Sequence, residues 1–491
     1  MTSAPGGAGP VGRAQGSDVP ADIGEPRGRR PAVSAGAVLA QVRSHWVLTL
    51  VVLAGLVVRL AYVTAYWPVF IVRPDSWAYL DASSTGMLDP TFPFGYSVLL
   101  ALLRPLGSFA AIAAVQHLFG LGLTVLGYAL LRRQRVARWL AAVAVAPLAV
   151  DAWQISLEHY VMADTLFTGL LLGGLALLLW SPRPSTWQCL GAGLLLAAAG
   201  LTRTVGLPVV AVALGYVLWR RLGWRSAIAF GLAATLPVVA YATVFAVQHG
   251  VFGLGEDTSR RYYGRAAQIV DCDRVPELDA RERRLCPPEP LGQRRAPDEY
   301  GLFPDSPAAA FAPDDPIFGS FVGKVFRAQP VDLAVALGRD FTYFFRSTTP
   351  TYRVACLHSL WVPQAGSPPC RPYQAQTGQG LNPSFDEAEP PASAVARAVR
   401  LHGFVFRTPP FLLLLIVLLV VAVSVARVRV AGPPVRGTWL LLTSGLVLLA
   451  MAVLGAMYDA RYAIPAVPLF TLAGALALHG LPRRQPDTST S

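Results

Sequence analysis

Acidic and arginine residues lie beside the ends of long apolar segments in this chain. Asp75 lies two residues after Arg73 in a polar loop. Arg203 separates two apolar stretches, and Asp459 lies two residues before Arg461. Ionisable groups at membrane depth are costly and tend to mark a substrate path or a catalytic site. A carboxylate can act as a general base toward a hydroxyl, and arginine binds phosphate through paired hydrogen bonds. These residue types predict chemistry on a phosphorylated lipid.

Each of these residues also has a structural interpretation. Asp75 precedes SWAYL and could cap a short helix, because aspartate is a good N-cap. Arg73 could simply pair with Asp75. Arg203 and Arg461 could be snorkelling side chains that reach the lipid headgroups, with Asp459 as a structural partner of Arg461. Local pattern alone leaves both interpretations open.

Further ionisable and aromatic residues extend the set of candidates. Arg59 falls within the first apolar segment and should face a cavity, a carboxylate or the headgroup layer. Glu158 and Asp164 surround the start of the fourth segment. Asp164 could instead stabilise a helix N-terminus through the helix dipole. Tyr79 and Asp81 lie in the polar loop after the first segment, where they could contact a substrate.

The composition is that of a membrane protein. Of the 491 residues, 54% are hydrophobic and only 14% are charged. A helix needs about 20 apolar residues to cross a bilayer core. We therefore predict an all-α polytopic membrane protein with about ten transmembrane helices, near residues 46–67, 109–131, 138–153, 160–180, 188–202, 204–219, 226–248, 409–427, 438–457 and 462–480.

Arginines occupy every second loop between these segments, which predicts an orientation. By the positive-inside rule the basic loops and both termini are cytoplasmic, in a plasma membrane. The net charge of +12 then reflects topology and not binding to nucleic acid. No cleavable signal peptide is visible, so the first helix would act as an uncleaved anchor. The predicted parts are a disordered tail (1–43), seven helices (44–248) with an outer loop (68–108), an extracytoplasmic insert (249–408), three helices (409–480) and a short tail (481–491).

The predicted insert contains four of the five cysteines. In an oxidising compartment these favour two disulfides, most simply the local pairs Cys272–Cys286 and Cys356–Cys370, although three connectivities are possible. Metal binding is the competing interpretation, but the CxxC spacing of zinc sites is absent. Cys189 lies within an apolar segment and is expected to be a buried thiol.

Two stretches of the insert, 317–326 and 331–345, carry apolar residues at helical spacing. They could be amphipathic helices that lie on the membrane surface, or they could form the core of the insert itself. The segment PFGYSVLLALL in the first outer loop is short for a transmembrane helix and is expected to lie at the membrane interface or to dip into it.

Familiar catalytic motifs are absent from the sequence. The chain has no Walker A motif, no GxSxG elbow, no GxGxxG after a strand and no HExxH. An ATP-driven pump and a nucleotide-sugar enzyme are therefore poorly supported. No cofactor is expected, although Asp75, Asp81 and Glu158 could in principle hold a divalent metal ion.

Several segments together resemble the C-type superfamily of membrane glycosyltransferases, which use polyprenyl-phosphate sugars. An arginine in the first helix precedes RPDSWAYL and PFGYSVLLALL, and the same order continues through the later helices. The similarity is greatest to the branch of protein O-mannosyltransferases and aminoarabinose transferases. The remaining matching segments are AVQHLFGLGLTVLGYALL, VMADTLFTGLLL, GAGLLLAAAGLTRTVGLP and RYAIPAVPLFTLAGALAL.

The resemblance implies an enzyme that transfers a sugar from a polyprenyl-phosphate donor to an acceptor hydroxyl on a glycan, lipid or protein. It makes Asp75 the catalytic base. Many relatives have a second acid next to it, whereas this chain has Ser76. Arg203 and Arg461 match arginines assigned to the donor phosphate. Arg73 and Arg59 are further candidates for the phosphate, and the candidates for contact with the substrate are Tyr79, Asp81, Glu158, Asp164 and Tyr462.

Three other functions compete with this one. A glycan ligase or polymerase with a lipid-diphosphate donor would use the same arginines. A transporter or flippase would need a path to both faces of the membrane, whereas the charges outside the basic loops gather on one side. A membrane scaffold would use the insert to bind partners.

Overall fold

A computed structural model describes residues 42–72, 75–256, 258–347, 361–363, 393–430 and 436–481. The chain divides into two units, Met1–His45 and Trp46–Ser491. In the first unit, residues 42–45 form a single turn, in which the His45 main-chain N–H donates to the Val42 carbonyl. Everything below concerns the second unit. Most of its described residues are helical, and the β-structure among them is one isolated parallel bridge between Phe70 and Tyr160. The prediction of an all-α fold is therefore confirmed for this part of the chain.

Every predicted apolar segment is helical in the structure. Within the described residues, five helices are long and apolar enough to cross a membrane. These are α2 (Trp46–Ala65), α5 (Phe109–Arg133), α11 (Trp224–His249), α20 (Pro410–Val430) and α21 (Thr438–Gly455). A sixth candidate consists of α6 (Arg138–Val150) and α7 (Ala152–His159), which are bent by 45° at their junction.

The prediction of ten transmembrane helices is not confirmed, because the remaining apolar helices are short. A helix of 17 residues rises only about 26 Å, which is less than the roughly 30 Å of a bilayer core. The structure thus has five candidate spans, or six with the bent pair. The short apolar helices are α4 (Gly95–Leu103), α8 (Asp164–Trp180), α9 (Thr186–Thr202), α10 (Leu207–Trp219) and α23 (Val467–His479).

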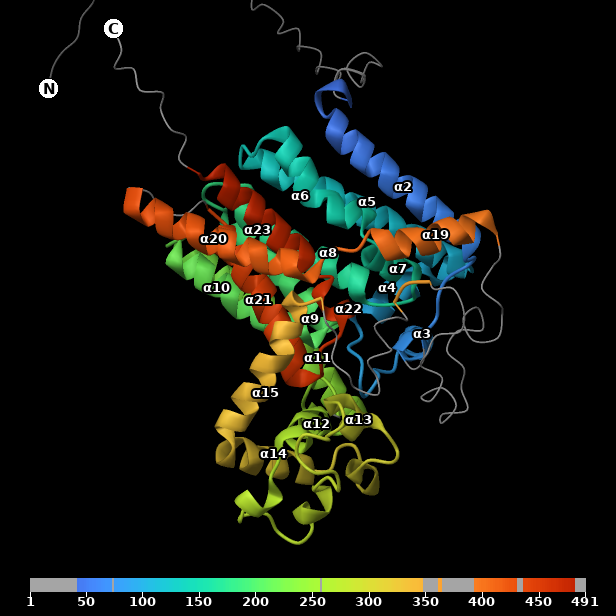
Figure 1. Cartoon of the computed structure of the whole chain (residues 1–491), viewed down its shortest axis with the longest axis vertical. Helices are drawn as coiled ribbons and strands as arrows, with labels where there is room; N and C mark the ends of the chain where they lie inside the picture. The colour runs from blue at the N-terminus through green and yellow to red at the C-terminus, as the bar shows by residue number, and fades with distance from the viewer. Residues whose placement is uncertain are drawn as a thin grey trace, which may run out of the picture. The chain divides into compact units, whose positions relative to one another are not determined.

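The helices pack around one large apolar core, to which α5, α6, α8, α9, α10, α11, α20, α21 and α23 all contribute (Figure 1). Close approach between helices depends on small residues, as is common in membrane bundles. A Cβ atom added at Gly193 of α9 would lie 2.5 Å from the Phe230 carbonyl oxygen of α11. One added at Gly174 of α8 would lie 2.8 Å from Leu196. These glycines therefore set the spacing of α8, α9 and α11.

The predicted insert has a core of its own. It contains α12 (Thr258–Ile269), α13 (Pro297–Leu302), α14 (Ile317–Ala328) and α15 (Pro330–Thr342). The apolar side chains of α14, including Phe318, Phe321 and Val325, pack with Tyr263 and Leu285 in this core. The structure therefore favours the core interpretation for 317–326. The second stretch, 331–345, contacts both parts of the structure. Leu333 packs against the core of the insert, whereas Phe341 and Phe345 contact the helical bundle.

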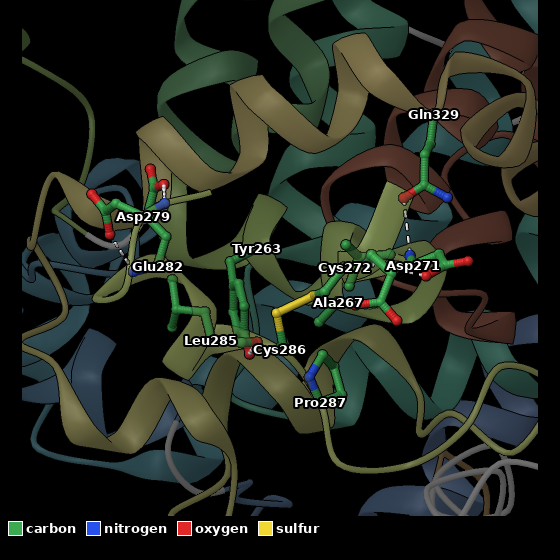
Figure 2. Close-up of a disulfide and its surroundings, with 12 residues drawn as sticks. Tyr263, Ala267, Asp271, Cys272, Asp279, Glu282, Leu285, Cys286, Pro287 and Gln329 are labelled. Atoms are coloured by element: carbon green, nitrogen blue, oxygen red, sulfur yellow. Dashed lines mark hydrogen bonds between the residues drawn. A yellow bond between two sulfur atoms is a disulfide. The ribbon is translucent and has the colours of Figure 1, made fainter. Parts of the chain in front are cut away.

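One disulfide, Cys272–Cys286, closes this core and confirms one of the two predicted pairs. Figure 2 shows it beside Tyr263, whose hydroxyl donates to the Leu285 carbonyl at 2.8 Å. Cys356 and Cys370 lie outside the described residues. Cys189 is free and buried, as expected.

The remaining elements are short. They are α3 (Asp75–Thr85), α19 (Ala394–Val405) and α22 (Ala460–Ala463), with short 3-10 helices at Arg104–Leu106, Thr204–Gly206, Cys272–Arg274, Glu282–Leu285, Pro307–Ala310 and Tyr343–Phe345.

Candidate functional site

Four segments that are distant in sequence bring their charged residues together. Asp75 is the first residue of α3 and Asp164 the first residue of α8, positions where a helix dipole favours a carboxylate. Arg203 is the C-cap of α9. Arg461 lies in α22, and Asp459 caps that helix by accepting a hydrogen bond from the main-chain N–H of Arg461 at 2.8 Å.

The guanidinium of Arg461 connects the two helix-terminal aspartates. Its Nη1 lies 3.1 Å from Asp75 Oδ2, and its Nη2 lies 2.9 Å from Asp164 Oδ2. Its Nε lies 3.2 Å from each oxygen of Asp164. Arg203 also donates from Nη1 to Asp164 Oδ1. We call Asp75, Asp164, Arg203 and Arg461 the Arg461 cluster, and all four were candidates from the sequence.

Exposure differs within the Arg461 cluster. The side chain of Asp75 is 18% exposed, whereas that of Asp164 is 2% exposed. Asp164 accepts hydrogen bonds from both arginines. Asp164 is thus suited to holding the two guanidinium groups in place, and Asp75 is the carboxylate that a substrate could reach more easily.

Two aromatic rings pack against the arginines of the cluster. The Arg461 guanidinium lies 4.9 Å from the ring centroid of Trp361, and that of Arg203 lies 5.4 Å from the ring of Tyr462. Trp361 Nε1 also donates to both oxygens of Asp459, at 3.0 and 3.2 Å. Tyr462 was a candidate from the sequence. Trp361 was missed, because a single tryptophan in a long polar segment carries no pattern that connects it to Arg461.

The other predicted residues of the first outer loop have different surroundings. Tyr79 is buried and its ring packs against Phe92 and Tyr96. Burial raises the pKa of the Tyr79 hydroxyl and Asp75 adds to the rise, so Tyr79 is neutral and able to donate. Asp81 is exposed. It follows Asp75 by six residues, which corresponds to a rotation of about 240° around the helix axis, so the two side chains lie on different sides of α3.

Ser76 occupies the position where a second acid was considered. It is fully buried, accepts from the main-chain N–H of Val72 at 2.9 Å and donates to the Val161 carbonyl at 2.8 Å. The neighbouring main chain forms the bridge between Phe70 and Tyr160. Ser76 thus connects the start of α3 to the segment before α8, and a charged side chain would not fit these contacts.

Asp298 of α13 is a further acid near the cluster that sequence reasoning missed. It is half-buried. Burial raises its pKa to about 6, the charges of Asp459 and Asp75 add to the rise, and two arginines of α12 oppose it. Its charge also acts on Tyr462. These electrostatic effects indicate that Asp298, and with it part of the insert, lies near the Arg461 cluster. Nothing in the sequence around PDEYGL indicated this proximity.

Arg59 faces a carboxylate, one of the environments expected for it from the sequence. Its Nε and Nη2 donate to the two oxygens of Glu158 at 2.7 and 2.8 Å. The other three hydrogens go to main-chain carbonyls of Gly55, Ala149 and Leu148. A guanidinium has five N–H donors, so all donors of Arg59 are used within the protein. No donor remains for a phosphate, and Glu158 is likewise enclosed.

Two histidines extend this buried network. His117 Nδ1 lies 3.0 Å from Glu158 Oε2, and its Nε2 lies 3.1 Å from His159 Nδ1. His159 Nε2 lies 2.8 Å from the Tyr66 carbonyl, which can only accept. A Cβ atom at Gly120 would lie 1.9 Å from Glu158, so the network needs glycine there.

The other candidates give less information. Arg73 lies outside the described residues. Among the residues that the structure does describe, no group of three or more histidine, cysteine or acidic side chains is arranged to hold a metal ion.

Comparisons with known proteins find a distant similarity among solved structures. No family model matches the chain, and no curated protein matches it. Among solved structures, the chain is similar to the S. cerevisiae protein O-mannosyltransferase complex bound to the sugar donor, with 17% sequence identity and a TM-score of 0.34. The similarity covers 49% of this chain and 39% of that chain, so the matched part is less than half of either. No residue role is taken from it.

Proposed function

We propose that this protein is a membrane glycosyltransferase that moves a sugar from a polyprenyl-phosphate donor to an acceptor hydroxyl. The observation that carries the proposal is the position of Arg461, which contacts Asp75 and Asp164 at once while Arg203 contacts Asp164. This places a partly exposed carboxylate beside two guanidinium groups at the ends of apolar helices. A general base and a phosphate-binding pair are the two groups that such a transfer needs.

Asp75 acts as the base in the proposed reaction. It takes the proton of the acceptor hydroxyl as the oxygen attacks the anomeric carbon, and the bond from that carbon to the phosphate oxygen breaks. The attack comes from the face opposite the phosphate, so the configuration at the anomeric carbon is inverted. The polyprenyl phosphate leaves with the electron pair of the broken bond. A phosphate leaving group is stable as an anion, so no acid has to protonate it.

Arg203 and Arg461 stabilise the charge that develops on the leaving phosphate. Asp164 and the rings of Trp361 and Tyr462 hold the two guanidinium groups before the substrate arrives. Preorganised donors of this kind need no rearrangement during the reaction. Arg461 uses three of its five donors on Asp75 and Asp164. We assign Tyr79, Asp164 and Tyr462 to positioning, with Arg73 kept as a phosphate candidate.

Arg59, Glu158 and Asp81 are left out of the proposed substrate site. Arg59 and Glu158 satisfy each other inside the bundle, and Asp81 faces outward on α3. We therefore propose that Arg59 and Glu158 have structural roles and that Asp81 contacts solvent.

The exposed tryptophans support the proposed position of a membrane boundary, and the arginine-rich loops beside them support its cytoplasmic assignment. Aromatic residues gather where a membrane meets water. Several exposed tryptophans lie at helix ends next to the arginine-rich loops, which we place on the cytoplasmic side with both chain termini. They are Trp46, Trp139, Trp187, Trp219 and Trp224. The Arg461 cluster then lies at the opposite, extracytoplasmic side, where a lipid-linked donor and its acceptor would meet.

The test compares membranes that contain the wild-type protein, Asp75→Asn or Asp81→Asn, supplied with radiolabelled polyprenyl-phosphate sugars. Asp81 lies on the same helix as Asp75 and is exposed, so its variant controls for loss of charge on α3. Loss of a general base typically costs between about 10² and 10⁴ in rate. We expect transfer by the wild type and by Asp81→Asn and little transfer by Asp75→Asn, with and without chelator.

Other results would revise the proposal in definite ways. Equal transfer by Asp75→Asn would remove this residue as the base. Transfer only from lipid-diphosphate donors, with release of a diphosphate, would identify a ligase or polymerase. Absence of transfer from both donor classes, with protein confirmed in the membrane, would contradict the proposed enzyme class.

A further inference from the structure

Helix α19 has an apolar surface on two opposite sides. Ala396 and Val399 are buried in a cluster with residues of α2 and α7, and Gly403 is buried beside Val362. At 100° per residue, Leu401 and Val405 lie on the side opposite these residues, and both are exposed. α19 also carries Arg397 and Arg400, and basic residues together with an apolar face are typical of helices that lie on a membrane surface. Within the described chain, only one side of α19 is covered.

The end of α19 is firmly attached to the bundle where α6 and α7 meet. His402 Nε2 lies 2.8 Å from the Val150 carbonyl, and the Ala152 main-chain N–H donates to the Phe406 carbonyl at 2.7 Å. The Thr408 main-chain N–H donates to Asp151 Oδ2 at 2.6 Å. These contacts fix how the helix is rotated, so the exposed apolar side is a constant feature and not a frayed terminus.

The exposed side of α19 continues two other exposed apolar stripes. On α2, exposed apolar residues recur every three or four positions and end near Trp67. On α20 a similar stripe begins at Phe411, just after α19 in the chain. Both helices are candidate membrane spans. Figure 1 shows α19 beside the C-terminal end of α2, which it contacts, so α19 lies where the α2 stripe ends and just before the α20 stripe begins.

We propose that α19 is a membrane-interface helix, and that its Leu401, Phe404 and Val405 side is covered by the headgroup–acyl boundary of a lipid bilayer. An apolar helix face that adjoins lipid-facing stripes of two spans is best covered by the same lipid. Such helices typically bury their apolar face about 5–10 Å into this boundary. The last part of the 249–408 segment is then seated in the membrane surface instead of belonging to a water-exposed insert.

Phe404 and Val331 offer a matched comparison, because they are similarly exposed and differ in location. Phe404 is 79% exposed on α19, and Val331 is 70% exposed at the start of α15. The neighbouring Leu333 packs against the core of the insert. The full-length protein carrying Phe404→Cys or Val331→Cys would be labelled with the polarity-sensitive dye NBD and placed in phosphatidylcholine–phosphatidylglycerol nanodiscs. The unsubstituted chain gives the background labelling of its own cysteines.

Nitroxide-labelled lipid and aqueous iodide then serve as two competing quenchers. We expect lipid nitroxide to quench the dye at position 404 at least about twofold more than at 331, and iodide to show the reverse order. Leu401→Cys should behave like Phe404→Cys, which guards against a local effect of one substitution. Equal iodide access at 404 and 331 would overturn the proposal. Protection of 404 from both quenchers would also overturn it, because that result identifies a protein on this face. Neither readout depends on the proposed enzymatic activity.

Discussion

Arg461 contacts both carboxylate oxygens of Asp164, although 297 residues separate them in the chain. The two residues connect α22, near the end of the chain, to the start of α8. Because the same guanidinium also reaches Asp75, the geometry of the Arg461 cluster depends on the planar fork of an arginine. Lysine carries a compact charge and cannot form this set of bonds.

Replacement of Arg461 by lysine is therefore expected to weaken phosphate binding although the charge is kept. Loss of a paired, stacked arginine should lower the affinity for farnesyl phosphate, a short polyprenyl monophosphate, by about tenfold or more. The measurement is equilibrium binding to the purified full-length protein. Arg133→Lys is the matched control, since Arg133 lies over the ring of Trp180 at 5.8 Å near the arginine-rich loops. Equal affinities of Arg461→Lys and the wild type would exclude Arg461 from the phosphate site.

Trp361 is expected to shield Arg461 from solvent and reagents. Its ring covers the guanidinium at 4.9 Å, and its Nε1 holds the capping residue Asp459. We expect Trp361→Ala to raise the rate at which phenylglyoxal modifies Arg461, by about tenfold, as water gains access to the ion pairs. Peptide mass spectrometry follows the adduct on each arginine separately.

The pair Trp180 and Arg133 supplies the control for this experiment. Trp180→Ala should accelerate modification of Arg133 and leave Arg461 unchanged. An unchanged Arg461 rate in Trp361→Ala would show that the tryptophan does not protect the guanidinium. This readout needs no donor, so it is independent of whether the protein transfers a sugar.

The sequence predicted the positions of the helices better than the number of spans. Apolar periodicity located segments such as 109–131 and 226–248 to within a few residues of α5 and α11. Hydropathy could not show that the third segment bends after Val150, because this break depends on the Asp151 side chain capping α7 by accepting from Trp153 and Gln154 N–H. Hydropathy also does not show where a helix ends, so short apolar helices were counted as spans.

The site could be predicted only in part. Ionisable residues beside apolar segments stand out in a sequence, so Asp75, Asp164, Arg203 and Arg461 were candidates, and the structure brings them into contact. Which carboxylate meets which arginine is a tertiary property, and this is why Arg59 was assigned to a phosphate when its partner is Glu158. Trp361 was invisible to pattern reasoning, because its function depends on a contact across 98 residues with Asp459.

Glu158→Gln is expected to destabilise the folded protein strongly. The substitution leaves Arg59 charged and buried without its carboxylate partner, a change that typically costs about 3–5 kcal/mol. The measurement is the apparent Tm of the detergent-purified protein, which should fall markedly.

A second buried glutamate serves as the comparison for this substitution. Glu282 pairs with Lys324 in the insert, where the lysine side chain is 21% exposed and can turn toward water. Glu282→Gln should therefore lower the Tm less than Glu158→Gln. A larger effect of Glu282→Gln would show that the Arg59–Glu158 pair does not hold the bundle together.

Asp298 is expected to make phosphate binding dependent on pH. Its pKa is raised to about 6, first by burial and then by the charges of Asp459 and Asp75. Below that pH it is neutral, and above it a further negative charge stands near the Arg461 cluster. The charge of Asp298 should therefore lower the affinity for farnesyl phosphate by about two- to threefold between pH 5 and 7. The same raised pKa favours the folded state at low pH, and that stability is lost as pH rises through about 6.

Asp298→Asn separates this effect from the titration of the ligand itself, since a phosphate monoester also loses a proton near pH 6. Both proteins experience the change in the ligand, and only the wild type experiences the change at Asp298. The ratio of the two affinities should be close to one at pH 5 and should favour Asp298→Asn at pH 7. A ratio that does not change between these pH values would mean that the charge of Asp298 does not reach the phosphate site. The insert would then be electrostatically separate from the Arg461 cluster.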